Sequence, residues 1–334
     1  MTIRWGILAT GGIAAKFTED LALVPDAEIA AVGSRTATAA EAFARRYGIP
    51  RAHASWTALA TDPSVDVVYV ATPHAAHYPA AMACIEAGKP VLVEKPFTLD
   101  VPSARALVAA ARDRGVFAME AMWMRCVPGI RQLTGLLAEG AIGEVTTVRA
   151  DFGLTGPFAA THRLRDPALG GGALLDLGIY PITLAHLALG APETIQATAQ
   201  LTPEGVDANT GLLFGYPSGA LAALTCGLMG STGGTAAVTG TDGRIDLPGP
   251  FHRPRHLVLR QRESVRTVAA DFAGWGYHFE AAEVNRCLRE GLLESPLVPL
   301  ATTLEVLGVL DTVRAQLGVV YPSASAQTAG SQWP

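Results

Sequence analysis

Residues 1–122 alternate short runs of β-branched residues with alanine-rich stretches of helical length. Parallel strands need long crossover connections, which are usually helices, so this alternation builds a parallel sheet with helices on both faces. The sequence therefore predicts a doubly wound α/β domain, a Rossmann fold. Its expected strands span residues 3–9, 28–33, 65–71, 90–94 and 116–120, and its expected helices span residues 12–23, 37–47, 76–87 and 101–114.

Residues 123–334 follow a different pattern. Short turns of proline, serine and glycine, or of aspartate and glycine, join several expected strands, which makes adjacent strands antiparallel. We therefore expect a second, α+β domain with an open, mostly antiparallel sheet and helices on one face. Its expected strands span residues 144–152, 193–201, 210–216, 219–227 and 235–240, and its expected helices span residues 128–139, 176–189, 277–290 and 302–317.

Charge and composition exclude several classes of partner. The formal net charge is −5 over 334 residues and no long run of Lys or Arg occurs, which argues against nucleic acid or an anionic membrane surface. The four cysteines lie far apart and form no Cys/His cluster with metal-ligand spacing. The chain opens on its first strand without a leader, and no segment reaches the ~20 apolar residues of a membrane span. We expect a cytoplasmic protein with a small-molecule partner and no metal, nucleic acid or membrane.

The first expected strand runs into a glycine-rich turn that opens a helix. In the dinucleotide fingerprint G-x-G-x-x-G/A, Gly11 and Ala14 occupy the last two positions, whereas Ala9 replaces the first glycine. The pyrophosphate of a dinucleotide binds to the free N–H groups of such a helix start. An ordinary glycine-rich turn is the alternative. The residues expected to contact the cofactor here are Ala9, Thr10, Gly11, Gly12 and Ile13.

Ser34 and Arg35 follow the second expected strand, about twenty residues after the turn. An NAD enzyme places Asp or Glu there, against the ribose 2′-hydroxyl. An arginine can instead pair with a 2′-phosphate, and the serine can add a hydrogen bond. The sequence thus favours NADP(H) over NAD(H), with a solvated arginine at a helix start as the alternative.

A buried apolar strand ends in Glu94, Lys95 and Pro96. Proline keeps Lys95 extended, so its ammonium stays at the carboxyl end of the strand, where such sheets bind ligands. With residues 71–77 before it, this motif resembles the glucose-fructose oxidoreductase / inositol dehydrogenase / rhizopine catabolism family, and the order of motifs resembles that family over nearly the whole chain. The resemblance implies a cofactor site that includes Thr72, Pro73, His74, His77, Glu94 and Lys95.

Within that family, the nearer resemblance is to the dimeric trans-dihydrodiol dehydrogenases and the NADP-dependent D-xylose dehydrogenases. It rests on residues 5–7, 119–125, 170–180, 276–280 and 310–314. Much of the wider family has a histidine at the position of Tyr180, so this departure puts an inositol-type mechanism in doubt. The subgroup resemblance implies a homodimer formed through the open sheet, with a tetramer as the alternative.

The same resemblance implies roles for four aromatic or basic residues. Trp123 and Arg125 would lie near the nicotinamide and the substrate, and Phe152 and Phe279 would form walls of the substrate pocket. The alternatives are a hinge aromatic, a structural ion pair and core packing.

Asp176 and Tyr180 are four residues apart, so on a helix they share one face, which can point toward Lys95. A phenol is a poor acid-base group at its free pKa of about 10, but a nearby ammonium stabilises the phenolate. We expect Tyr180 to transfer the proton, Lys95 to activate it and Asp176 to orient the substrate. The alternatives are a core tyrosine, a surface lysine and a helix-capping aspartate.

These residues predict an NADP(H)-dependent dehydrogenase or reductase that acts on a CH–OH group of a small sugar, polyol or cyclic diol. Hydride would pass between the nicotinamide and a carbinol carbon. One alternative is an NAD(H)-dependent inositol or sugar dehydrogenase, and another is a dinucleotide-binding regulator without turnover. The joint presence of Lys95, Asp176 and Tyr180 argues against the regulator.

Overall fold

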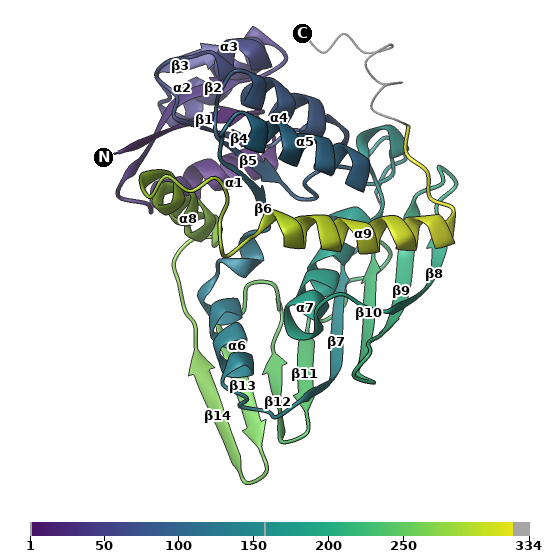
Figure 1. Ribbon diagram of the computed structural model, residues 1–334. Helices are drawn as coiled ribbons and strands as arrows, with labels where there is room; N and C mark the ends of the chain where they lie inside the picture. Colours follow the sequence, from purple (N-terminus) through teal and green to yellow (C-terminus); the bar gives the residue numbers. More distant parts are fainter. Residues whose placement is uncertain (1, 157, 323–334) are drawn as a thin grey trace. The chain divides into compact units, whose positions relative to one another are not determined.

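The computed structural model describes residues 2–156 and 158–322 (Figure 1). Residue contacts divide them into two compact units. The first contains residues 2–123, the segment 273–304 and Pro322, and the second contains residues 124–156, 158–272 and 305–321. The segment 273–304, which the sequence analysis assigned to the second domain, thus packs with the first unit.

The first unit is built on a six-stranded, fully parallel sheet with the order β3-β2-β1-β4-β5-β6. The order reverses between β1 and β4, which is the topological switch point of a Rossmann fold, and the predicted fold class is confirmed. The strands are β1 Ile3–Leu8, β2 Ala27–Gly33, β3 Arg51–His53, β4 Val67–Val70, β5 Val91–Glu94 and β6 Ala118–Ala121. The helices are α1 Gly12–Leu21, α2 Ala37–Tyr47, α3 Trp56–Ala60, α4 His77–Glu86, α5 Val101–Asp113 and α8 Tyr277–Arg289, with a 3₁₀ turn η1 at His74–Ala76.

Local capping fixes several of these helices. Thr36 accepts a hydrogen bond from the Ala39 N–H at the start of α2, and Gly48 ends that helix in the left-handed region. Asp100 caps α5 in the same way through the Ser103 N–H. The ends of α2 coincide with the predicted ones, because a threonine before a helix and a glycine after it are recognisable capping residues in the sequence.

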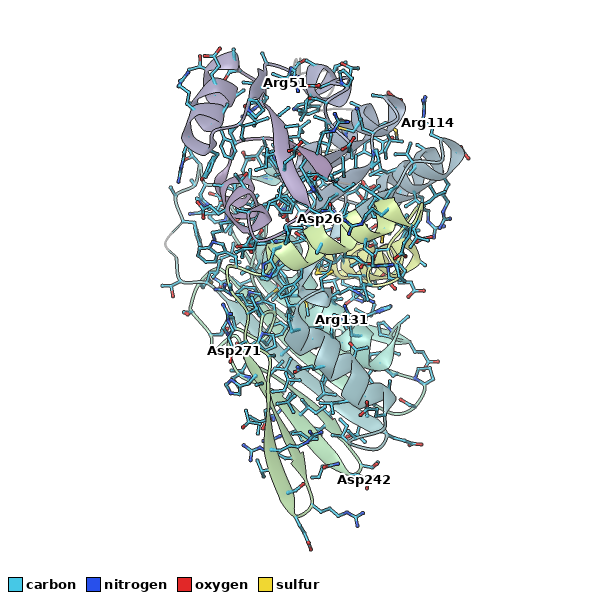
Figure 2. The ribbon with its side chains drawn as sticks, turned by 90° about the vertical axis from the view of Figure 1, so that its left-hand side faces the viewer. Asp26, Arg51, Arg114, Arg131, Asp242 and Asp271 are labelled. Atoms are coloured by element: carbon cyan, nitrogen blue, oxygen red, sulfur yellow. The ribbon has the colours of Figure 1, made fainter. Side chains whose placement is uncertain are left out.

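Side chains far apart in sequence attach α8 to the first unit. Trp5 Nε1 donates to Asn285 Oδ1 at 3.1 Å, and Asn285 Nδ2 donates to the Asp26 carbonyl at 3.2 Å. Asp26, labelled in Figure 2, also forms an ion pair with Arg289. Local sequence patterns carry no signal for such pairings, so the membership of α8 in this unit could not be foreseen.

Asp62 follows α3 and is 7 % exposed. It accepts hydrogen bonds from the Ser64 N–H at 2.8 Å and hydroxyl at 2.6 Å, and it lies 2.8 Å from His53 Nε2. Burial alone would raise the pKa of this carboxyl, but these hydrogen bonds lower it to about 2. The charged carboxylate is therefore part of the native structure of the first unit.

This depressed pKa predicts a pH dependence of stability. A carboxyl with a lower pKa in the folded than in the unfolded state stabilises the fold above its unfolded pKa of about 4, and this contribution is lost as the pH falls toward 2. Asp62→Asn should therefore cost about 2 kcal/mol at pH 7 and much less at pH 2.5. Urea unfolding of both proteins at the two pH values measures this, and an equal loss at both would contradict it.

The second unit holds an eight-stranded sheet with the order β14-β13-β12-β11-β7-β10-β9-β8. Its strands pair antiparallel except β7 and β10, which are parallel, so the predicted mostly antiparallel sheet is confirmed. Helices α6 and α7 pack on one face of the sheet (Figure 1). The strands are β7 Val145–Gly153, β8 Thr194–Leu201, β9 Asp207–Gly215, β10 Leu221–Gly227, β11 Ala236–Gly240, β12 Gly243–Leu247, β13 His256–Gln261 and β14 Ser264–Ala269, and the helices are α6 Pro128–Ala138 and α7 Ile179–Leu189. Helix α9 Leu300–Leu317 begins in the first unit and belongs to the second from residue 305 onward.

One expectation about apolar segments was wrong. The helical stretch Pro167–Leu189 has 23 residues, and an 18-residue window within it has a mean hydropathy of 1.4, which is long and apolar enough to cross a membrane by length and composition alone. However, 78 % of its apolar window is buried inside the protein, as in the core helix of a folded domain. Its burial against the sheet of the second unit accounts for its apolar character.

Candidate active site

The turn between β1 and α1 presents a helix start without a side-chain cap. Gly11 occupies the N-cap position and makes no side-chain hydrogen bond. A Cβ placed on Gly11 or on Gly12 would meet no atom within 4 Å, so there is open space beside both residues. Free N–H groups facing open space suit an anion such as a pyrophosphate.

Ala9, which replaces the first fingerprint glycine, has a φ of +106°. A side chain disfavours this region, whereas glycine adopts it readily. The Ala9 N–H donates to the Gly33 carbonyl at 2.8 Å, which holds the residue in place despite the strain. The turn thus keeps the shape that glycine usually gives it.

The strain predicts that Ala9→Gly stabilises the first unit. Relief of about 1–3 kcal/mol of backbone strain outweighs the added chain entropy of glycine, leaving a gain of about 1 kcal/mol. We expect a rise of about 2–4 °C in the melting temperature, measured by calorimetry. Ala14→Gly, inside helix α1, is the control and should lower it; a fall in Ala9→Gly as well would contradict the strain argument.

Ser34 and Arg35 follow β2, and Gly33 at the end of β2 pairs with Leu8 at the end of β1. Both residues therefore lie at the same edge of the sheet as the Gly11 turn. The Ser34 N–H donates to the His53 carbonyl at 3.0 Å, and Arg35 is exposed. An exposed guanidinium at this edge is accessible to a phosphate group.

The carboxyl ends of β4 and β5 lie at that edge too, and the ring of His77 contacts the segments that follow both strands. Its Nδ1 lies 2.7 Å from the Pro96 carbonyl oxygen, and its Nε2 lies 2.9 Å from the Thr72 carbonyl oxygen. The ring is fully buried, and burial lowers the pKa of His77 to about 3. His77 thus faces two protein carbonyls and supports the segment that contains Lys95. Pro73 is half-buried and His74 is 8 % exposed beside it.

The side chain of Glu94 forms a hydrogen bond with the backbone of Lys95. Its Oε2 accepts from the Lys95 N–H at 3.1 Å, and its Oε1 accepts a short hydrogen bond from the Tyr69 hydroxyl. Both side chains are buried, and burial together with the Glu94 charge raises the pKa of Tyr69. Lys95 itself is half-buried at the end of β5.

The aromatic residues that follow β6 are largely buried. Trp123 is 4 % exposed, and its ring centroid lies 4.6 Å from that of Tyr277. Arg125 is half-buried in the same 3₁₀ turn, η2 Trp123–Arg125. Phe279 is half-buried on α8, with its ring 4.0 Å from His278. Trp123 and Phe279 therefore both have protein packing partners in the first unit.

Asp176 and Tyr180 lie at the start of the core helix of the second unit. The spacing argument assumed an α-helix, but residues Leu174–Gly178 form a π-helical turn that leads into α7. Asp176 is in the π turn and Tyr180 is in the first turn of α7. Both are buried, with residue exposures of 6 % and 5 %.

Asp207 on β9 supports the start of that helix. Its Oδ2 accepts from the Leu174 N–H at 2.7 Å and from the Thr210 hydroxyl at 2.8 Å. Before the helix, Gly172 has a φ of +113°, and a Cβ there would lie 2.2 Å from Asp207 Oδ1. The backbone that leads to Asp176 therefore requires glycine at this position.

Two residues that the sequence analysis did not select lie beside the predicted ones. Arg163 pairs with Asp176, and His252 packs with its ring 5.0 Å from Tyr180 and 4.7 Å from Phe152. Phe152 in turn lies 5.6 Å from Tyr180. Both missed residues are on loops with no periodic pattern, so no local signal marks them. The rings of Phe152, Tyr180 and His252 form one aromatic cluster.

The predicted site residues are thus divided between the two units. The cofactor residues that follow β1, β2, β4 and β5, with Lys95 among them, lie at one edge of the first sheet, whereas Arg125, Phe152, Asp176 and Tyr180 belong to the second unit. The meeting of Lys95 with Tyr180 remains a prediction. Among residues 2–156 and 158–322, no group of three or more His, Cys, Asp or Glu side chains is placed to hold a metal ion.

Known protein families match both parts of the chain. A family model described as an oxidoreductase family with an NAD-binding Rossmann fold matches residues 3–122, and the model of the GFO/IDH/MocA carboxy-terminal domain matches residues 130–246. The chain belongs to the GFO/IDH/MocA family. The resemblance inferred from the Glu-Lys-Pro motif is confirmed.

Several members of the family match over nearly their whole length. The trans-1,2-dihydrobenzene-1,2-diol dehydrogenase of Bos taurus is 37 % identical over 333 residues, covering 96 % of this chain and 99 % of the relative. The enzyme of the same name from Mus musculus is 38 % identical over 336 residues, with the same coverage. These relatives show that the chain is an oxidoreductase of the dehydrogenase type.

Among solved structures, the 3-ketoreductase of Actinomadura kijaniata in complex with NADP and TDP-benzene has a TM-score of 0.83 at 28 % identity. The match covers 95 % of this chain and 98 % of the ketoreductase. Structures of that enzyme with a tyrosine replaced by phenylalanine and with a lysine replaced by alanine also contain NADP. A protein similar to this chain over nearly its whole length was thus crystallised with NADP.

Proposed function

We propose that this oxidoreductase uses NADP(H) and transfers hydride to or from a carbinol or carbonyl carbon of a small sugar, polyol or cyclic diol. The observation that carries the proposal is the placement of three features at one sheet edge. The open helix start at Gly11, the exposed Arg35 and the supported Lys95 all follow strands of one parallel sheet, where such folds bind dinucleotides. The dihydrodiol dehydrogenases and the NADP-bound ketoreductase support the same reading.

The residues at this edge fit the cofactor. The N–H groups of the α1 start would hold the pyrophosphate, and Ser34 with Arg35 would hold the 2′-phosphate of the adenosine ribose. The carboxyl ends of β4 and β5 would receive the nicotinamide half, with Thr72, Pro73 and Glu94 near it. When bound, the cofactor supplies or accepts the hydride, and the protein supplies position and proton transfer.

The protein side of the reaction is assigned to three residues. Tyr180 would donate a proton to the carbonyl oxygen during reduction, or take it from the hydroxyl during oxidation. Lys95 would stabilise the phenolate form and hydrogen-bond the reacting oxygen, and Asp176 would orient the substrate. The tyrosine and lysine variants prepared for the related ketoreductase are consistent with these two residue types.

An assay with a panel of substrates distinguishes a catalytic oxidoreductase from a dinucleotide-binding regulator without turnover. NADP⁺ reduction is followed with sugars and diols, and NADPH oxidation with dicarbonyls, each repeated with the non-phosphorylated cofactor. We expect turnover with at least one substrate class and a preference for the phosphorylated cofactor. Tight NADPH binding without turnover on the whole panel would favour the regulator, and a preference for NADH would favour the NAD-dependent alternative.

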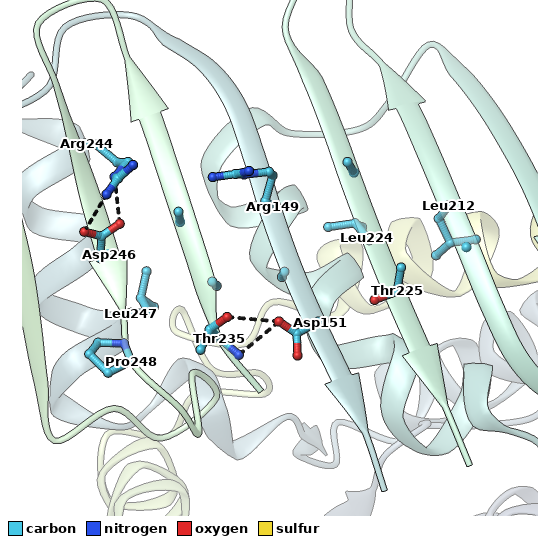
Figure 3. Close-up of a pocket in the computed structure, with 15 residues that line it drawn as sticks. Arg149, Asp151, Leu212, Leu224, Thr225, Thr235, Arg244, Asp246, Leu247 and Pro248 are labelled. Atoms are coloured by element: carbon cyan, nitrogen blue, oxygen red, sulfur yellow. Dashed lines mark hydrogen bonds and ion pairs between the residues drawn. The ribbon is translucent and has the colours of Figure 1, made fainter. Parts of the chain in front are cut away.

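We also propose a homodimer formed through the exposed face of the second sheet. A groove of about 630 Å³ lies over β7, β9, β10, β11 and β12 (Figure 3). Cross-strand register places Leu213, Ala223, Arg149 and Ala237 side by side on this face, and Leu213 is 43 % exposed. An apolar sheet face of this kind gains stability when a second copy covers it.

The double substitution Leu213→Lys and Leu221→Lys should therefore separate the dimer. Both leucines are exposed on the same sheet face, and a buried ammonium without a partner opposes association. Size-exclusion chromatography with light scattering should show a dimeric wild type and a monomeric variant, with unchanged circular dichroism. A monomeric wild type, or an unchanged mass in the variant, would refute the proposed interface.

A cytoplasmic location completes the proposal. All four cysteines are free thiols and all are buried, as expected in a reducing compartment. The apolar helix of the second unit is buried in its core, so it does not need a membrane.

A further inference from the structure

Asp176 does not stand alone in the second unit, because Arg163 binds its carboxylate with two hydrogen bonds. Arg163 Nη1 lies 3.2 Å from Asp176 Oδ1, and Nη2 lies 3.3 Å from Oδ2. The side chain of Asp176 is 8 % exposed, whereas that of Arg163 is 50 % exposed. One partner is therefore nearly out of water, and the other is accessible to a ligand.

Arg163 has donors to spare. A guanidinium carries five N–H groups, and the parallel pair with Asp176 uses two of them. The other N–H groups of Arg163 meet no protein acceptor within the described part of the chain. A half-exposed, oriented guanidinium with spare donors can bind an oxygen atom of a small molecule.

Another residue already anchors the loop that contains Arg163. Arg165, two residues along, binds Glu204 through three hydrogen bonds of 2.7 to 3.1 Å and donates to the Phe158 carbonyl at 3.1 Å. Asp166 then caps the 3₁₀ turn Pro167–Leu169. Arg165 and Asp166 already anchor the loop. The ion pair between Arg163 and Asp176 is therefore not needed for that purpose.

The pair offers an acceptor and a donor side by side. A carboxylate accepts a hydrogen bond from a substrate hydroxyl, and a guanidinium beside it donates to the oxygen of a neighbouring hydroxyl. The aromatic cluster of Phe152, Tyr180 and His252 lies in the same unit, and its Tyr180 is four residues from Asp176. Two adjacent hydroxyls on a carbon ring match this combination, whereas a substrate with a single hydroxyl offers no oxygen to the remaining N–H groups of Arg163.

We propose that Arg163 is a specificity-determining residue, which together with Asp176 binds two adjacent hydroxyl groups of the substrate and so selects vicinal diols over single alcohols. This inference rests on the proposed function, which places Asp176 in the substrate site. Asp176 takes the hydroxyl nearer the reacting carbon, and Arg163 takes the next one. A substrate without the second hydroxyl reacts with the same machinery but gains nothing from Arg163.

The test compares two matched substrates and three variants. NADP⁺ reduction is measured with trans-cyclohexane-1,2-diol and with cyclohexanol, for the wild type, Arg163→Met, Arg163→Lys and Arg165→Met. Arg163→Met should lower kcat/KM for the diol about 10- to 100-fold and change it for cyclohexanol less than about 3-fold. For Arg163→Lys, kcat/KM for the diol should lie between those of the wild type and Arg163→Met, because lysine keeps the positive charge but lacks the planar guanidinium with its parallel N–H donors.

The control separates recognition from loop anchoring. Arg165→Met removes the other ion pair of the same loop, so it should affect the diol and the single alcohol equally. An equal loss with both substrates in Arg163→Met would show that Arg163 only positions Asp176 or the loop, and no loss with either would show a surface role. Either result would overturn the inference.

A binding measurement tests the role of Arg163 independently of the proposed catalytic function. Calorimetric titration of the diol into the wild type with bound NADP⁺ should show binding that Arg163→Met weakens more than Arg165→Met does. If the wild type binds the diol but turns over neither substrate, the catalytic proposal fails while the recognition by Arg163 stands. If the diol does not bind to the wild type at all, the inference about Arg163 fails.

Discussion

Tyr180→Phe is expected to lower kcat by a factor of roughly 10² to 10⁴ while leaving NADPH affinity unchanged. The substitution removes only the hydroxyl, so a group that transfers a proton is lost without a change in ring packing. The ring of Tyr180 is buried against Phe152 and His252, and phenylalanine keeps those contacts. A large loss of turnover with normal folding would therefore report chemistry rather than stability.

Tyr216→Phe is the matched control for that experiment. Tyr216 is in the same unit, is 6 % exposed and has a buried hydroxyl without a hydrogen-bond partner among the described residues. Removing this hydroxyl should leave kcat unchanged. Stopped-flow measurement of the hydride step and fluorescence titration of NADPH provide the two readouts. Normal turnover in Tyr180→Phe would exclude Tyr180 as the proton donor.

Arg35→Asp is expected to weaken NADPH binding about 100-fold or more and to leave NADH binding unchanged or stronger. A charge-assisted hydrogen bond contributes about 1.5–3 kcal/mol, and the new carboxylate adds repulsion of the 2′-phosphate. The side chain is exposed at the sheet edge, so the substitution should not disturb folding. Dissociation constants from fluorescence quenching, measured at two salt concentrations, give the effect.

Arg45→Ala provides the control for a change in surface charge. Arg45 is on α2 of the same unit, and its side chain is 71 % exposed in an ion pair with Glu41. Its loss should change the affinity for neither cofactor. An Arg35→Asp variant that keeps its affinity for NADPH would mean that Arg35 is only a solvated residue at the start of α2.

The sequence predicted the features that depend on local patterns. The ends of α2 were correct because Thr36 and Gly48 mark them, and the Glu94-Lys95 motif was placed correctly at the end of β5. Short elements such as β3 and α3 were missed because three to five residues carry too little periodicity. Strand β14 was missed because nearly all its side chains are exposed, which removes the alternation that marks a half-buried strand.

The candidate site was predictable only in part, for a related reason. Lys95, Asp176 and Tyr180 belong to motifs that can be recognised along the chain. Arg163 and His252 are brought beside Asp176 and Tyr180 by loops, and loop conformation depends on contacts distant in sequence. The π-helical turn at Leu174–Gly178 was not foreseen either, since its sequence also suits an α-helix.

The position of α8 has a consequence for biosynthesis. The indole of Trp5 finds its hydrogen-bond partner 280 positions later in the chain, and Asp20 binds the backbone N–H groups of residues 275–277. The nucleotide-binding half therefore cannot finish folding on the ribosome until nearly the entire polypeptide has been made. A gene fragment that stops after residue 122 would leave these groups unsatisfied, so the two halves of this enzyme should not be separable by simple truncation.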